Sequence, residues 1–205
     1  MNMQICSGWD CADNMWPTIE PTHTIPDGLV TFMVADSWRH PEEFCHFYID
    51  DYRFDRLWAR PESYIEVLRR YKGVIGPDFS TYTDMPYPMQ MWNKYRSMAL
   101  THYWQSEGID VIPELQFSDQ KSLEWAFDGM PKYSVLACSS VGVARNRESR
   151  RRFVEGMEQA CRMLEPAGLI MYGSKVDFDA NDAEVYWFKN DNHERVVRNV
   201  QKSEE

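Results

Sequence analysis

The sequence has no apolar run that approaches the roughly 18 residues of a membrane-spanning helix. Its first ten residues, MNMQICSGWD, lack the basic-then-apolar order of a signal peptide. Basic residues are also scarce, because 22 Lys and Arg face 32 Asp and Glu, which gives a net charge of −10. A general nucleic-acid surface needs a basic footprint, so none is predicted. These absences favour a cytoplasmic protein without a membrane partner.

Tight pairs of metal-binding residues are missing as well. The five cysteines include no C-x-x-C pair, and two of them, Cys138 and Cys161, fall in apolar segments. Reduced thiols are therefore predicted. The alternative is a zinc site assembled from residues of the amino-terminal part: Cys6, Cys11, His23, His40, Cys45 and His46.

Motifs of several enzyme classes are also lacking. The chain has no G-x-S-x-G elbow, no Walker phosphate loop and no G-x-G-x-x-G turn. Only five histidines are present, and His102 lies beside the apolar face of a predicted helix, where a structural role is favoured. Nucleophilic catalysis therefore has little support.

What the sequence does contain is an alternation of apolar strands and amphipathic helices. The predicted strands are 29–36, 74–80, 110–117, 134–140 and 168–174, with one more in 182–191, and the predicted helices are 61–71, 88–105, 119–129 and 147–166. Residues 44–61 are predicted to be extended and then turned. The pattern indicates an α/β fold with a mostly parallel sheet and flanking helices, either open and doubly wound or curled into a partial barrel. An irregular arm (1–28) precedes this α/β domain (29–188), and a charged tail (189–205) follows it.

Polar clusters end the predicted strands, and the carboxyl ends of parallel strands meet at one edge of the sheet, where ligands bind. Asp78 and Glu114 are the strongest candidates, because two facing carboxylates can act as acid and base or hold Mg²⁺ or Mn²⁺. No other cofactor is predicted. The candidate ligand-binding residues are Ser80, Tyr82, Asp84, Trp92, Asn93, Arg96, Gln116, Ser139 and Arg145.

Each of these residues also has a structural interpretation. Asp and Ser are preferred helix N-caps, so Asp119 and Ser139 could simply satisfy backbone groups. The segment CSSVGVARNRESRRRF places Gly142 and Arg145 before a helix, an arrangement that can hold a phosphate, but its arginines could equally form a solvated basic stripe.

Four stretches together resemble a known family: FYIDDYRFDRLW, GPDFSTYTDMPYPMQMWNKYR, YWQSEGIDVIPELQFSD and FDGMPKYSVLACSSVG. It is domain of unknown function 4417, found in phages, prophages and other mobile elements, and the resemblance spans 47–173. The resemblance implies no established activity. It does imply that the family signature includes Asp78, Ser80, Asp84, Gln90, Trp92, Asn93, Tyr95, Arg96 and Trp104.

The leading hypothesis is a protein that binds a small phosphorylated ligand or nucleotide at this edge of the sheet. If it is an enzyme, it would hydrolyse or transfer a phosphoester or glycosidic bond, with a stacking role for Trp92 or Tyr82 and a phosphate contact from Arg96 or Arg145. The alternative is a non-catalytic acidic interaction protein that blocks a host protein or defence system, or that sequesters a nucleotide.

Overall fold

Two parallel sheets form the centre of the computed structural model, which describes residue 5 and residues 16–37 and 40–190. The first sheet has the order β1 (Leu29–Thr31), β2 (Phe44–His46), β3 (Gly73–Ile75) and β4 (Val111–Ile112). The second has the order β5 (Val135–Ser139), β6 (Gly168–Tyr172) and β7 (Glu184–Phe188). Every pairing is parallel, which confirms the predicted α/β class.

A single parallel bridge links the two sheets. Glu114, just beyond β4, pairs with Ala137 of β5, and the Leu115 N–H donates to the Ala137 carbonyl oxygen at 2.8 Å. The strands therefore follow one another in chain order across both sheets, without the reversal that defines a doubly wound fold. Of the two predicted alternatives, the partial barrel describes this arrangement.

Side chains alternate between the two faces of the strands, as the two-residue period of a strand requires. In β6, Ile170 and Tyr172 join an interior cluster that both sheets line, whereas Leu169 and Met171 face the opposite side. In β2, Phe44 faces the interior cluster and Cys45 faces outward. The interior cluster comprises Phe44, Tyr48, Ile75, Ile112, Val135, Ala137, Ile170 and Tyr172.

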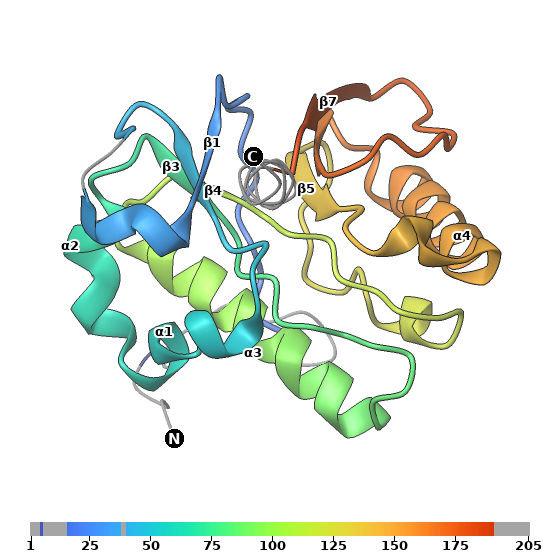
Figure 1. Cartoon of the computed structure of the whole chain (residues 1–205), viewed down its shortest axis with the longest axis horizontal. Coiled ribbons are helices and arrows are strands. Elements are labelled where there is room, and N and C mark those ends of the chain that lie inside the picture. Colours follow the sequence, from blue (N-terminus) through green and yellow to red (C-terminus); the bar gives the residue numbers. More distant parts are fainter. Residues whose placement is uncertain (1–4, 6–15, 38–39, 191–205) are drawn as a thin grey trace, which may run out of the picture.

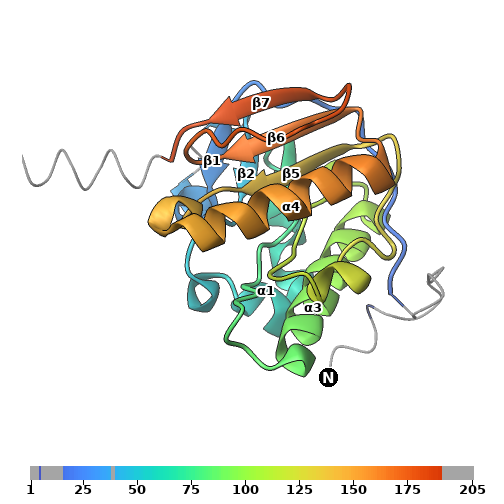
Figure 2. The same cartoon turned by 90° about the vertical axis from the view of Figure 1, so that its right-hand side faces the viewer.

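Helices cover the outer faces (Figures 1 and 2). The longest are α3 (Tyr87–Ser106) and α4 (Arg147–Leu164), and the short α1 (Arg56–Ala59) and α2 (Ile65–Leu68) lie beside the first sheet. Helix α4 packs an apolar stripe on β5 and β6, in which Phe153, Met157, Cys161 and Leu164 are buried. In Figure 2 the arrowheads of β6 and β7 point toward the side at which α4 begins.

Several predicted elements are shorter in the structure. The strand predicted at 29–36 ends at Thr31 and continues as the 3₁₀ helix η2 (Phe32–Ser37), so Asp36 and Ser37 do not end a strand. The helix predicted at 119–129 is reduced to the 3₁₀ turn η5 (Ser122–Glu124). Residues 61–71 form the 3₁₀ helix η4 (Pro61–Tyr64) and then α2. Two further 3₁₀ turns are η3 (Asp51–Arg53) and η6 (Val143–Arg145).

The described part of the arm, residues 16–28, lies at the amino ends of β4 and β5. The hydroxyls of Thr22 and Thr24 donate to the two carboxylate oxygens of Asp110, which directly precedes β4. The Val135 N–H donates to the Thr22 carbonyl oxygen at 2.7 Å. This part of the arm is therefore at the opposite end of these strands from the predicted ligand edge.

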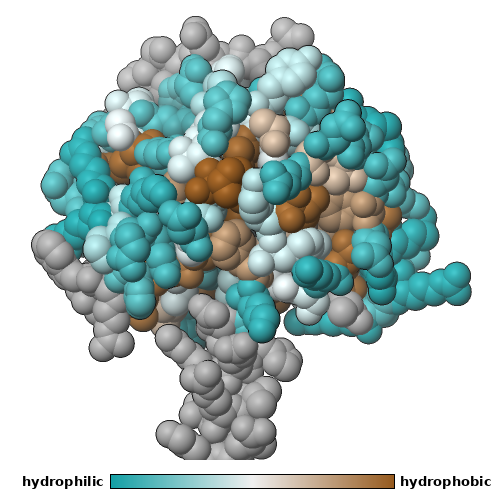
Figure 3. Space-filling view, turned by 90° about the horizontal axis from the view of Figure 1, so that it is seen from above, coloured by the Kyte–Doolittle hydropathy of each residue, from teal (hydrophilic) through white to brown (hydrophobic). Residues whose placement is uncertain are grey.

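The face between β1 and β7 carries hydrophobic side chains at its middle and hydrophilic ones around them (Figure 3). Four partly buried side chains pack against the interior cluster: Ile25 of the arm, Leu29 of β1, and Tyr186 and Phe188 of β7. None of the helices in the described residues is long and apolar enough to cross a membrane.

Candidate functional site

Chemically active side chains gather where the parallel strands end. His46 is the last residue of β2, Ser139 is the last of β5, and Tyr172 is the last of β6. Asp78 follows β3 by three residues, and Glu114 follows β4 by two. These polar side chains therefore lie at or just after the carboxyl ends of the strands, where the sequence predicts a ligand site.

Glu114 is the buried member of the carboxylate pair, with 6% of its surface exposed. The Tyr48 hydroxyl donates a hydrogen bond to Glu114 Oε2 at 2.6 Å, and the backbone N–H of Ser139 also donates to this carboxylate. Burial, followed by the charge of Asp78, raises the pKa of Glu114 well above its usual range. The two hydrogen bonds oppose this shift without cancelling it, so the surroundings of Glu114 favour its protonated form.

Asp78 is half-buried, and so is less enclosed than Glu114. Burial, followed by the charge of Asp51, raises the pKa of Asp78 to about 7, and a hydrogen bond from Gln116 partly offsets this rise. The Gln116 amide also donates to the Phe79 carbonyl oxygen at 2.7 Å, which ties the loop after β3 to the one after β4. The pair therefore combines a buried acid whose protonated form is favoured with a half-buried carboxyl that titrates near neutrality.

Three predicted ligand-binding residues, Ser80, Asn93 and Arg96, form one network below this loop. The Ser80 backbone N–H and hydroxyl donate to the Asp51 carboxylate at 3.1 and 2.8 Å. The Asn93 amide donates to the Ser80 carbonyl oxygen at 2.6 Å, and Arg96 donates to Asn93 Oδ1 at 2.7 Å. The contacts fix the loop that presents Asp78.

The Arg96 guanidinium is engaged on two sides. It pairs with Asp55, and its centre lies 3.8 Å from the centroid of the Phe79 ring. Only 12% of the Arg96 side chain is exposed. Of the two arginines predicted to contact phosphate, Arg96 thus has a structural partner already.

Other predicted ligand-binding residues are exposed at the surface of the protein. Tyr82 and Asp84 are exposed on the loop before α3. Trp92 is 45% exposed on α3, where its ring stacks on Tyr95 and meets the edge of Trp58.

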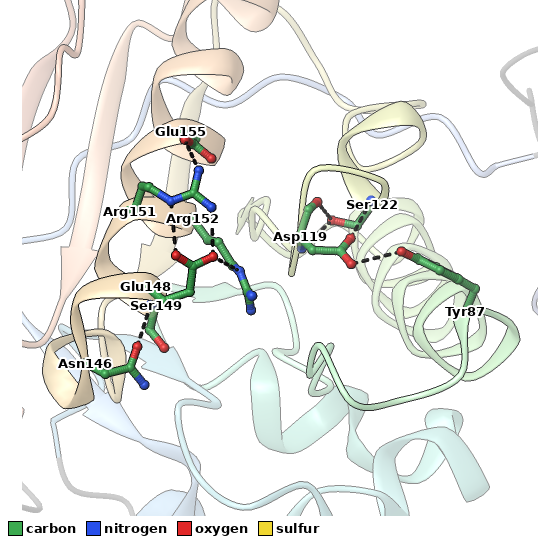
Figure 4. A network of polar contacts seen from close by, with 9 residues as sticks. All are labelled: Tyr87, Asp119, Ser122, Asn146, Glu148, Ser149, Arg151, Arg152 and Glu155. Carbon is green, nitrogen blue, oxygen red and sulfur yellow. Dashed lines mark hydrogen bonds and ion pairs between the residues drawn. The ribbon is translucent and has the colours of Figure 1, made fainter.

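The start of α4 differs from the predicted phosphate site (Figure 4). The Asn146 side chain caps the helix by accepting from the Ser149 N–H at 2.8 Å, as helix N-caps do. Arg151 and Arg152 both contact Glu148, and Arg151 also contacts Glu155, so these arginines are paired within their own helix. These contacts lower the pKa of Glu148, chiefly through the hydrogen bond from Arg151.

Arg145 is exposed on η6, and its guanidinium folds back over Gly142. Gly142 adopts a φ of 84°, a left-handed conformation that favours glycine, and so turns the chain directly after β5. Among the described residues Arg145 has no ion pair, so it keeps its charge available beside the carboxyl edge.

Tyr48 and Asp51 are absent from the candidates that the sequence offers, and His46 appears there only as a possible zinc ligand. They follow or end β2, a strand of only three residues that was predicted merely as extended chain. The two-residue period of a strand puts His46 on the same face of β2 as Phe44, and this spacing is the signal that places His46 beside the interior cluster.

Metal-ligating groups are sparse among the described residues. One surface group, His40 with Glu42 and Glu43, has ligand atoms within 4.8 Å of one another. The zinc site considered from the sequence involves Cys6 and Cys11, which lie outside the described residues. Its other members diverge, since Cys45 faces outward from β2 while His46 faces inward.

Comparison with known proteins identifies relatives in phages. Over 163 residues the chain is 34% identical to the Gene 1 protein of Mycobacterium phage L5. The aligned region covers 77% of this chain and 70% of the phage protein. It is 32% identical over 163 residues to the Gene 1 protein of Mycobacterium phage D29, and spans 59% of that protein's length. No solved structure matches.

The family comparison agrees with the resemblance seen in the sequence and extends it beyond 47–173. The model of the domain of unknown function DUF4417 matches residues 11–189. This range contains Asp78 and Glu114 with their neighbours Tyr48 and Asp51, and it covers most of the chain. The chain therefore belongs to the DUF4417 family.

Proposed function

We propose that this phage-related protein binds a small nucleotide-type or phosphorylated ligand at the carboxyl ends of its strands and transfers protons to and from it. The observation that carries the proposal is the pair formed by Glu114, buried and hydrogen-bonded to Tyr48, and Asp78, half-buried beside it. Burying two carboxyl groups together opposes folding, and such arrangements are concentrated at functional sites.

The two carboxyl groups are suited to different roles. The surroundings of Glu114 favour its protonated form, which can donate a proton, whereas Asp78, with a pKa of about 7, is partly ionised at neutral pH and can accept one. Two carboxyl groups whose pKa values are separated by their surroundings are a common acid–base arrangement.

Of the two predicted bond types, a glycosidic bond fits this pair better than a phosphoester. Glycoside cleavage uses one protonated and one ionised carboxyl group on either side of the bond. A phosphoester carries negative charge, which Asp78 and Asp51 would repel. The nearest arginine of the loop network, Arg96, is committed to Asp55.

A phosphate on the ligand would instead face Arg145. This residue is exposed on the loop that follows Ser139, whose N–H contacts Glu114. The ligand would thus extend from the carboxylate pair to the turn at Gly142. The phage relatives favour such a nucleotide-related role, because mobile elements depend on nucleic-acid metabolism and on evading host defence.

A thermal-shift screen tests the proposal. Nucleosides, nucleotides, cyclic nucleotides and sugar phosphates are added with and without Mg²⁺ or Mn²⁺, since a carboxylate pair could also hold a divalent ion. Binding to the native state at a hundredfold excess over Kd stabilises it by about 2.7 kcal/mol. We expect a shift that Asp78→Asn removes. A flat screen across all four ligand classes would overturn the proposal.

The second candidate function, a non-catalytic interaction protein, draws support from one exposed surface. Met89, Met91 and Trp92 on α3 are 51%, 40% and 45% exposed, and Trp58 of α1 lies against Trp92. Aromatic and Met side chains are frequent interface anchors. A photo-crosslinking residue at Met89 should then give a host-protein adduct of defined mass, while the same residue at Met163 on α4 should not.

A further inference from the structure

His46 stands apart from the other buried polar residues of the site. It is 1% exposed, and its ring lies 4.5 Å from the Tyr172 ring and 5.2 Å from the Tyr48 ring, measured between centroids. The two tyrosine rings also stack on each other at 4.8 Å with an interplanar angle of 18°. His46 is therefore packed against both tyrosine rings, one of which, Tyr48, donates to Glu114.

The hydrogen bonding of His46 fixes its tautomer. Nδ1 accepts the backbone N–H of Tyr48 at 3.2 Å, so the ring proton must be on Nε2. Burial lowers the pKa of His46 to about 3, which keeps the ring neutral at physiological pH. Nε2–H is thus a permanent hydrogen-bond donor.

That donor has no acceptor among the described residues, although the Nε2 atom is buried. Leaving a buried donor unpaired is unfavourable, and native proteins contain few such groups. A ligand acceptor would remove this cost, which a purely structural histidine would not need to bear.

We propose that His46 is a ligand-binding residue whose Nε2–H donates to a carbonyl-type oxygen of an uncharged heterocycle, such as the lactam edge of a nucleobase. This inference rests on the proposed function, because it names the ligand class of the same site. It assigns the nucleobase to the interior end of the site, beside His46, and any phosphate to the outer end, beside Arg145.

The neighbouring groups complete this recognition pattern. A lactam edge presents a C=O acceptor beside an N–H donor. His46 and protonated Glu114 supply donors, and the Asp78 carboxylate supplies an acceptor, so both parts of the edge can be satisfied. The tyrosine rings offer flat surfaces on which a planar heterocycle can stack. An anionic group would fit poorly, since Asp78 and Asp51 would repel it.

Access to His46 requires one side chain to move. The Tyr172 ring covers His46, and the Tyr172 hydroxyl donates to Asn190 Oδ1 at 3.2 Å. Turning this ring aside would open the interior end of the site from the carboxyl edge. Rotamer changes of this kind are common when a ligand binds.

The test measures binding of uridine, guanosine, their 5′-monophosphates and ribose 5-phosphate by calorimetry. The proteins are the wild type, His46→Phe, Asp78→Asn and the control His102→Phe, which replaces a histidine that contacts Thr18 in the arm. We expect nucleosides and nucleotides to bind, and His46→Phe to lose about tenfold in affinity, the value of one hydrogen bond. His102→Phe should bind as the wild type does.

A second readout needs no variant. In ¹⁵N-labelled wild type, the Nε2–H resonance of His46 should shift when uridine binds, and it should keep the neutral-imidazole nitrogen shifts down to pH 5. This measurement keeps the inference testable if His46→Phe fails to fold.

The outcomes separate the two proposals. Nucleoside binding that His46→Phe leaves unchanged, with an unmoved Nε2–H resonance, would overturn the role of His46 and leave the proposed function standing. If ribose 5-phosphate bound and the nucleosides did not, the role of His46 would likewise be overturned and the proposed function would stand. If no compound bound, the proposed function would fall and the inference with it.

Discussion

Tyr48 and Glu114, which follow different strands of the first sheet, are joined by a hydrogen bond of 2.6 Å from the phenol to Oε2. This bond favours the ionised form of Glu114 and is the main force opposing the rise of its pKa. It therefore controls how strongly Glu114 holds its proton.

Tyr48→Phe should raise the pKa of Glu114 further, because the variant loses a donor to the carboxylate. The pKa of Asp78 should stay at about 7, since burial, the charge of Asp51 and the hydrogen bond from Gln116 set it and the variant changes none of them. The stability cost should be about 1 kcal/mol. Carboxyl ¹³C NMR titration measures both groups. Tyr87→Phe, which removes a hydrogen bond to Asp119, is the matched control. A fall in the pKa of Glu114 would contradict this account.

Asp78→Asn should make the protein more stable above pH 7 and abolish the proposed activity. The folded-state pKa of about 7 lies above the ordinary value of 3.8, so the folded protein binds the proton more tightly. This group's stabilising contribution is complete below pH 3.8 and is lost as the pH rises through 7. The gain in stability should therefore vanish toward pH 4.

Denaturant unfolding at pH 4, 6 and 8 measures the effect of Asp78→Asn. Asp84→Asn, which removes an exposed aspartate from the loop before α3, controls for the loss of one negative charge. Equal gains at all three pH values would show that the raised pKa of Asp78 is not the cause.

Lys94→Met should stabilise the protein, most strongly at and below pH 7. Lys94 is fully buried, its Nζ has no hydrogen-bond partner among the described residues, and the Trp16 ring centroid is 5.8 Å away. Burial lowers the pKa of Lys94 from 10.5 to about 7, while Asp128 opposes this shift. Between these values the unfolded chain binds more protons, so wild-type stability should rise with pH from 7 to 10.5.

The gain from Lys94→Met should be a few kcal/mol, since each pKa unit corresponds to about 1.4 kcal/mol. Thermal or urea unfolding from pH 6 to 10 measures it, with Lys132→Met, an exposed lysine, as the control. A constant difference between Lys94→Met and the wild type over this range would contradict the prediction.

Gly156→Ala should destabilise the protein by about 1–3 kcal/mol, the usual cost of overpacking. A Cβ at position 156 of α4 would lie 2.2 Å from Cε2 of the Phe117 ring. Adding Phe117→Leu should recover part of the loss, which a double-mutant cycle in urea would quantify. If the two changes were simply additive, this contact would not be the reason for the glycine.

An element can be predicted from the sequence when it is long enough to show its hydrophobic period. Strands β5 and β6 and helices α3 and α4 are long enough to show their periods, and they were predicted within a few residues. Asp78 and Glu114 could be nominated from the sequence because each follows an apolar run. In contrast, β2 has three residues, too few for a period, so Tyr48 is not a candidate from the sequence and His46 is one only for zinc.

The arginines show a different limit. The pairing of Arg151 with Glu148 and Glu155 could have been predicted from the three- and four-residue spacing alone. The pairing of Arg96 with Asp55 joins residues 41 positions apart, and only the tertiary structure reveals it.

The arm also constrains the order in which the chain can fold. Thr22 bonds to Ser134, 112 positions away, and to Asp110, 88 positions away. During synthesis, residues 16–28 leave the ribosome long before either partner exists, so they must wait until most of the chain has followed. Contacts of such long sequence separation slow folding. The arm should therefore be among the last segments to dock, after β4 and β5, whose amino ends it contacts, have begun to form.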